Sequence, residues 1–139
     1  MEKKTGDNQE LIALLEIWIN IEKSTIDSTS SVFPEVNDKL LRSLIGDIRG
    51  DSQKHKELLE MILAMEKNET TLMQGQEETI IKSFIKTHAV LEENAVEMAE
   101  DIFKKVTNPV SKLVIGYILQ DEKKHNFLMD ALENHYQET

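Results

Sequence analysis

Three glutamates and two histidines in this chain lie at spacings that suit a metal site. Glu22 precedes His55 by 33 residues, and Glu92 precedes His125 by the same interval. Glu122 lies three residues before His125, so both side chains share one face if the segment is helical. Carboxylate and imidazole groups together bind iron, manganese or zinc. Glu22, His55, Glu92, Glu122 and His125 are therefore the predicted metal ligands.

Helical periodicity dominates the segments that must position these residues. Apolar side chains recur at intervals of three and four, which predicts helices over about 9–30, 34–67, 76–106 and 109–135. The chain has only two prolines, Pro34 and Pro109, and both are expected in a first helical turn, where a missing N–H costs nothing. The predicted fold is all-α, with the four helices packed as a bundle.

Polar residues interrupt each predicted apolar stripe at one level. The interruptions are Glu22 in the first segment, Ser52 and His55 in the second, His88 and Glu92 in the third, and Glu122 and His125 in the fourth. An unpaired buried charge costs several kcal/mol. These groups must therefore satisfy one another, or a metal must satisfy them all.

The sequence also repeats itself without gaps at a shift of 70 residues. The repeat pairs Glu22 with Glu92, Phe33 with Phe103, Gly46 with Gly116, Asp51 with Asp121, Lys54 with Lys124 and His55 with His125. It predicts a duplicated helical hairpin. The expected organisation is a polar segment over 1–8, then one four-helix domain over 9–139, with hairpins at 9–67 and 76–136 and a linker at 68–75.

Glu22, His55, Glu92 and the run Glu122-Lys-Lys-His125 resemble the pattern of the ferritin-like di-iron carboxylate superfamily, particularly its rubrerythrin branch without the rubredoxin domain. The resemblance covers about 9–136. It implies a ferritin-like bundle that binds iron, with zinc or manganese as alternatives. It also implies that Glu22 and His55 are terminal ligands of one ion, that Glu92 and His125 are terminal ligands of the other, and that Glu122 bridges the two.

Three features depart from the family pattern. Ser52 stands where a second bridging carboxylate is expected, and the neighbouring Asp51 should point about 100° away on a helix. Ala95 stands where rubrerythrins that reduce peroxide carry a further glutamate. The chain has no cysteine, which excludes a rubredoxin-like electron donor. Five ligands remain, and both a mononuclear and a dinuclear site stay open.

The expected function is therefore iron-type metal binding, with a rubrerythrin-like peroxidase or ferroxidase activity implied by the resemblance alone. The alternative is a non-catalytic helical bundle whose degenerate metal site serves structure or interaction. Iron storage would require a cage assembly, which nothing in the sequence indicates.

Composition and charge restrict the partners and the location. The formal net charge of −10 without a basic stripe argues against binding to nucleic acid. No apolar run reaches the roughly 18–20 residues that span a bilayer, and the polar start of the chain lacks a signal-peptide core. A cytoplasmic protein without a membrane partner is predicted.

The length of the linker bears on oligomeric state. In a ferritin-like bundle the second and third helices run parallel. To bring His55 and Glu92 to one level, the linker must then cover some 40 Å from the end of the second helix to the start of the third. Eight extended residues reach only about 28 Å. Either helix unwinds between Met65 and Gln76, or the hairpins pair between chains as a domain-swapped homodimer. An up-down-up-down bundle needs only the short linker and also stays open.

Overall fold

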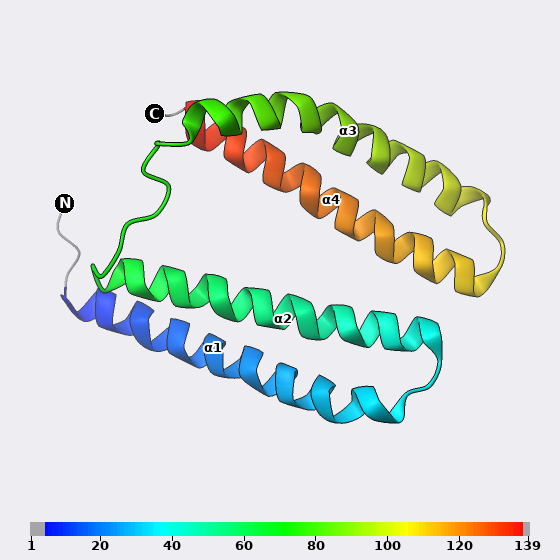
Figure 1. The fold of residues 1–139 in the computed structure, drawn as a ribbon, viewed down its shortest axis with the longest axis horizontal. Helices are drawn as coiled ribbons and strands as arrows, with labels where there is room; N and C mark the ends of the chain where they lie inside the picture. Colours follow the sequence, from blue (N-terminus) through cyan, green and yellow to red (C-terminus); the bar gives the residue numbers. More distant parts are fainter. Residues whose placement is uncertain (1–4, 138–139) are drawn as a thin grey trace. The chain divides into compact units, whose positions relative to one another are not determined.

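The structure, a computed structural model, describes residues 5–137, with side chains from Asn8 onward. Its helices are α1 (Thr5–Val32), η1 (Phe33–Glu35, a 3₁₀ turn), α2 (Lys39–Glu66), α3 (Glu78–Lys105) and α4 (Pro109–Gln137) (Figure 1). Residues 5–137 contain no strand. The all-α prediction with four long helices is confirmed.

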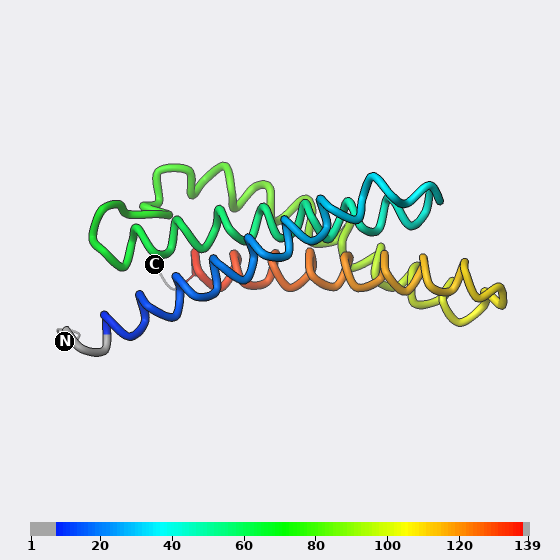
Figure 2. Tube along the Cα trace, turned by 90° about the horizontal axis from the view of Figure 1, so that it is seen from below, coloured from blue at the N-terminus to red at the C-terminus, as the bar shows by residue number. Residues whose placement is uncertain are grey.

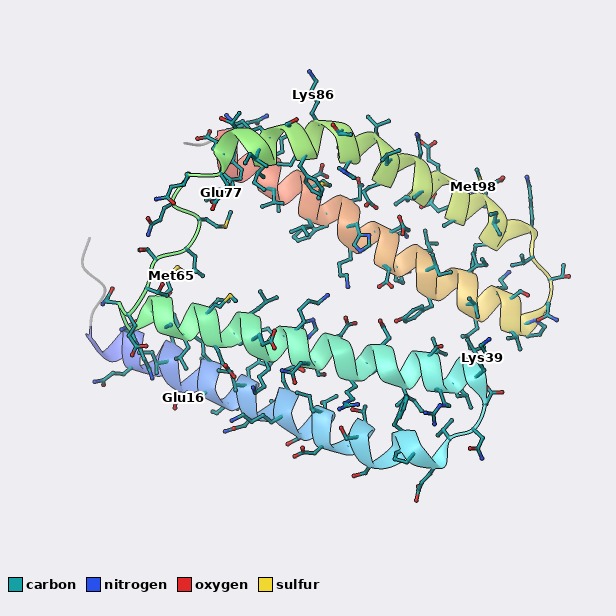
Figure 3. All side chains as sticks on the ribbon, in the orientation of Figure 1. Glu16, Lys39, Met65, Glu77, Lys86 and Met98 are labelled. Atoms are coloured by element: carbon teal, nitrogen blue, oxygen red, sulfur yellow. The ribbon has the colours of Figure 1, made fainter. Side chains whose placement is uncertain are left out.

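The four helices pair as two hairpins. α1 contacts α2, and α3 contacts α4, which Figures 1 and 2 show from two directions. The hairpins form two compact units, and the division falls between Gln74 and Gly75. Figure 3 shows the side chains along both hairpins, with Lys86 projecting from α3 away from α4. The expectation of a single four-helix domain over 9–139 stays a prediction.

The start of α2 differs from the prediction. The helix begins at Lys39 rather than Pro34, because Val36 is extended (φ −101°, ψ 122°) and interrupts the helical backbone. Pro34 lies instead in η1. The Asp38 carboxylate then caps α2 by accepting a 2.9 Å hydrogen bond from the Leu41 N–H.

The other boundaries lie closer to the predictions. α4 begins at Pro109, as expected. α1 begins at Thr5 and so takes in part of the segment predicted over 1–8, of which residues 1–4 lie outside the described part of the chain. The linker runs over 67–77 instead of 68–75. Asn68, Met73 and Gly75 within it have φ values of 60°, 56° and 90°, which no helix accommodates.

Each hairpin buries one narrow apolar seam between its two helices. Leu15, Ile19 and Leu59 form the seam of the first hairpin, and Ile85, Met129 and Tyr136 form the seam of the second. Leu15 corresponds to Ile85 in the 70-residue repeat, and Leu59 corresponds to Met129. Two of the three seam positions are therefore equivalent in the two hairpins.

Contacts near each interhelical turn also recur at positions 70 residues apart. The Arg42 guanidinium lies 4.0 Å from the centroid of the Phe33 ring, and the Lys112 ammonium lies 4.8 Å from that of Phe103. Asn108 caps α4 by accepting a 3.1 Å hydrogen bond from the Ser111 N–H, as Asp38 does for α2. The matched sequence positions thus make matched contacts.

A second set of apolar side chains stays exposed on each hairpin. Trp18, Phe84 and Ile118 are 53%, 42% and 42% exposed. The reason is geometric, since a helix in a two-helix hairpin is covered on one side only.

None of the helices in the described residues has an apolar stretch long enough to cross a membrane.

Candidate metal centre

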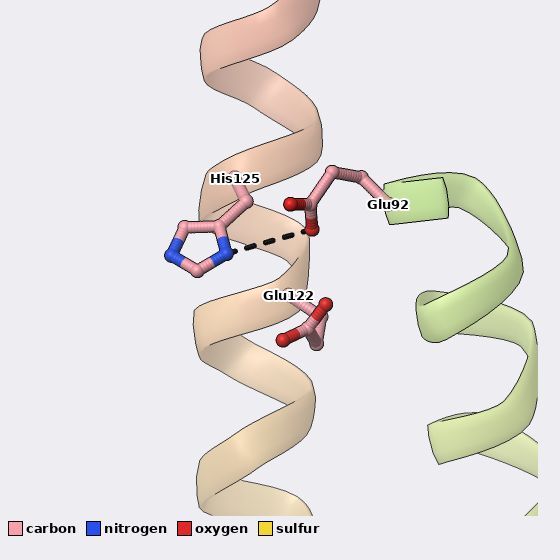
Figure 4. A group of neighbouring side chains, drawn as sticks. All are labelled: Glu92, Glu122 and His125. Carbon is pink, nitrogen blue, oxygen red and sulfur yellow. Dashed lines mark ion pairs between the residues drawn. The ribbon is translucent and has the colours of Figure 1, made fainter. Parts of the chain in front are cut away.

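The second hairpin brings three of the predicted ligands together. Glu92 reaches across from α3, while Glu122 and His125 project from successive turns of α4 (Figure 4). Each offers one ligand atom, and these atoms all lie within 4.8 Å of one another. We call Glu92, Glu122 and His125 the triad. Two carboxylates and an imidazole at this separation can converge on a single cation.

One oxygen of the triad lacks a hydrogen bond. Glu92 Oε2 is buried without a hydrogen-bond partner, and His125 Nδ1 lies 3.5 Å from it. A buried acceptor left in this state costs free energy comparable to a lost hydrogen bond. A bound cation would remove that cost.

The electrostatics of the triad favour the protonated form of one carboxyl. Burial raises the pKa of Glu122, and a hydrogen bond with Glu92 together with the negative charge of Glu92 raise it further. The charge of His125 acts in the opposite direction. A divalent ion bound beside Glu122 would act in the opposite direction, because its positive charge favours the ionised carboxylate.

The first hairpin brings together the other two predicted ligands. His55 Nδ1 of α2 lies 3.1 Å from Glu22 Oε2 of α1, within hydrogen-bonding distance, and Glu22 is 8% exposed. Among the described residues no third carboxylate or histidine joins them at ligand spacing. Ser52 occupies the position equivalent to Glu122 and is 5% exposed. This hairpin holds a pair where the second hairpin holds a triad.

Each predicted ligand thus lies beside a predicted ligand of its own hairpin. The union of pair and triad into a single five-ligand site stays a prediction, because it depends on how one hairpin packs against another. The pairing within each hairpin is shown by the Glu–His distances of 3.1 and 3.5 Å.

Polar residues near the ligands have other contacts. Asp51 and Asp121 each lie 3.8 Å from a lysine one turn later, Lys54 and Lys124 respectively. Asp51 joins no group of three ligands with Glu22 and His55, so it does not replace the missing carboxylate. His88 stacks on Phe84 with 4.3 Å between ring centroids and lies outside the triad.

The buried hydroxyl of Tyr117 was not foreseen as an unpaired group. Its oxygen has no hydrogen-bond partner. The sequence carries no signal for an unpaired hydroxyl, since that depends on which atoms surround it after packing.

Comparisons with protein-family models, with curated proteins and with solved structures find no match to this chain. The ferritin-like resemblance therefore rests on the residues of the chain.

Proposed function

We propose that this protein binds a divalent iron-type ion through Glu92, Glu122 and His125, with Glu22 and His55 as further ligands. The observation that carries the proposal is the buried Oε2 of Glu92, which accepts no hydrogen bond and lies beside a second carboxylate and an imidazole. Manganese and zinc prefer the same mixture of oxygen and nitrogen ligands. Iron held by these residues would supply redox chemistry toward oxygen or peroxide, in keeping with a rubrerythrin-like role.

Two features support the triad as an open site. Three protein ligands leave coordination positions for water or for additional side chains. The His125 side chain is 46% exposed, so an ion has a route to the imidazole.

The exposed apolar residues support a bundle in which both hairpins contribute ligands. On α2, Leu41, Ile48 and Ile62 recur every seven residues, and His55 occupies the remaining place in that series. All of these side chains are exposed on their own hairpin. A seven-residue apolar repeat packs against another helix of the same kind. We therefore propose a ferritin-like bundle of duplicated hairpins, in which the packing face carries His55.

The length of the linker is compatible with either source of the second hairpin. With α2 ending at Glu66 and α3 beginning at Glu78, parallel helices with His55 and Glu92 at one level require the linker to cover about 38 Å. The linker, residues 67–77, spans roughly 36–40 Å when extended. Both a bundle within one chain and a domain-swapped homodimer satisfy this length. The mass in solution by light scattering, together with exchange between differently tagged chains, distinguishes them.

Metal content is the direct test of binding. Protein purified without chelators is expected to contain iron, manganese or zinc at about one ion per chain or more, and added Fe²⁺, Mn²⁺ or Zn²⁺ should raise the unfolding temperature of the chelator-treated protein. Metal content well below one ion per chain, with an unfolding temperature that none of these ions changes, would reject the proposal. The alternative role as a metal-free structural or interaction bundle would then stand.

A further inference from the structure

The two hairpins can be compared position by position, because matched residues make matched contacts. The Asp51–Lys54 and Asp121–Lys124 pairs have the same 3.8 Å separation. The Glu–His distances are also close, at 3.1 Å for Glu22–His55 and 3.5 Å for Glu92–His125. Position 52 in the first hairpin therefore corresponds in structure as well as in sequence to position 122 in the second.

The two hairpins differ at this position in the number of ligand groups. Glu122 brings a second carboxylate to Glu92 and His125. Ser52 brings only a short neutral hydroxyl, buried at 5% exposure. The remaining carboxylate oxygen also differs, since Glu22 Oε2 is hydrogen-bonded to His55 whereas Glu92 Oε2 has no hydrogen bond. The first hairpin thus joins its carboxylate to its imidazole by a hydrogen bond, whereas the second leaves a buried carboxylate oxygen that a cation could bind.

Resting on the metal site proposed above, we infer that each chain holds one ion on its second hairpin, and that Ser52 is the residue that withholds a second ion from the first hairpin. Glu22 and His55 are only two ligands and are hydrogen-bonded to each other. They therefore hold an ion less tightly than the three converging ligands of the triad. Glu22 and His55 then adjust the affinity of the single ion rather than bind one of their own.

The geometry of α2 allows the missing ligand to be restored. Residues 52 and 55 are three apart on one helix, the same spacing as Glu122 and His125. A glutamate at position 52 would share a face with His55 and lie across from Glu22. The variant Ser52→Glu should therefore complete a second triad.

Native mass spectrometry with Zn²⁺ counts the ions directly, and Zn²⁺ has no redox chemistry to complicate the count. The expected result is one ion per chain in the wild type and two in Ser52→Glu. Ser52→Gln, which adds similar volume without a carboxylate, is the matched control and should keep one. The exchange variant Ser52→Glu/Glu122→Ser should also bind one ion, but its retention should now depend on His55 instead of His125.

The outcomes separate this inference from the proposed function. A wild type that binds no ion rejects the proposed function itself. Two ions in the wild type, or a single ion in a Ser52→Glu variant that is folded by circular dichroism, overturns only the inference. If Ser52→Glu does not fold, the ion is counted instead in single variants of the wild-type chain. His55→Ala should keep one ion at reduced affinity, and His125→Ala should keep none. Equal loss in both variants contradicts the assignment of the ion to the second hairpin.

Discussion

The Glu92 carboxylate of α3 lies 3.5 Å from the His125 imidazole of α4, and the oxygen that makes this approach is buried without a hydrogen bond. The equivalent oxygen of Glu22 is hydrogen-bonded to His55 at 3.1 Å. The two Glu–His pairs, equivalent in the repeat, thus differ in whether the carboxylate oxygen nearest the histidine accepts a hydrogen bond.

Removal of a triad ligand should abolish stoichiometric metal binding. Glu92→Ala or His125→Ala is expected to lower the affinity for Zn²⁺ by more than the roughly 10–100-fold typical of outer-shell changes, because a direct ligand is lost. Isothermal titration calorimetry measures the affinity. His88→Ala is the control, since His88 stacks on Phe84 outside the triad. Equal losses in the control and the ligand variants would contradict the assignment.

The metal-free protein should be stabilised by neutralising Glu122. Burial and the neighbouring Glu92 raise the pKa of Glu122, so its ionised form disfavours the folded state. We expect Glu122→Gln to raise the unfolding temperature in EDTA and to reduce the further rise that Zn²⁺ produces in the wild type. Thermal unfolding by circular dichroism with and without Zn²⁺ tests both effects. Glu97→Gln, an exposed change on α3 that removes the same negative charge, controls for altered net charge.

The stability of the metal-free protein should depend on pH with a defined sign. Because the folded-state pKa of Glu122 is raised, its contribution is complete below the ordinary carboxyl pKa and is lost as the pH rises through the raised value. Urea denaturation of the wild type in EDTA should therefore show this loss of stability, and Glu122→Gln should lack it. The stabilisation that a metal ion adds should increase as the pH rises, because the ion competes with protons for the ligands. An identical pH dependence in both proteins would refute the role of Glu122.

Two helical glycines, Gly46 and Gly116, should respond differently to alanine. Alanine is favoured over glycine within a helix by about 0.8–1.0 kcal/mol. A Cβ at position 46 would lie 3.6 Å from the Phe33 ring, an ordinary contact, whereas a Cβ at position 116 would lie 3.2 Å from the Phe103 ring. Gly46→Ala should therefore stabilise by up to about 1 kcal/mol, and Gly116→Ala should stabilise less or destabilise. Urea denaturation of both variants gives the comparison, and a larger gain at position 116 would contradict it.

The sequence by itself determined the helices and the partners within each candidate site. Helix formation follows from local periodicity, and the Glu122–His125 pairing follows from a three-residue spacing on one helix. The equal spacing of Glu22–His55 and Glu92–His125 identified the two pairs as equivalent positions of the repeat. The repeat also identified Ser52 as the position in the first hairpin that lacks the carboxylate of Glu122.

Only the tertiary structure decided which groups are satisfied. Whether Glu92 Oε2 has a hydrogen bond depends on the distance and orientation of side chains on another helix, which no spacing along the chain specifies. The start of α2 at Lys39 likewise depended on the extended Val36 and the Asp38 cap, which outweighed the preference of Pro34 for a first turn. The exposure of Trp18 also depends on tertiary structure. A periodic apolar stripe shows which side of a helix can be buried but not which neighbour covers it.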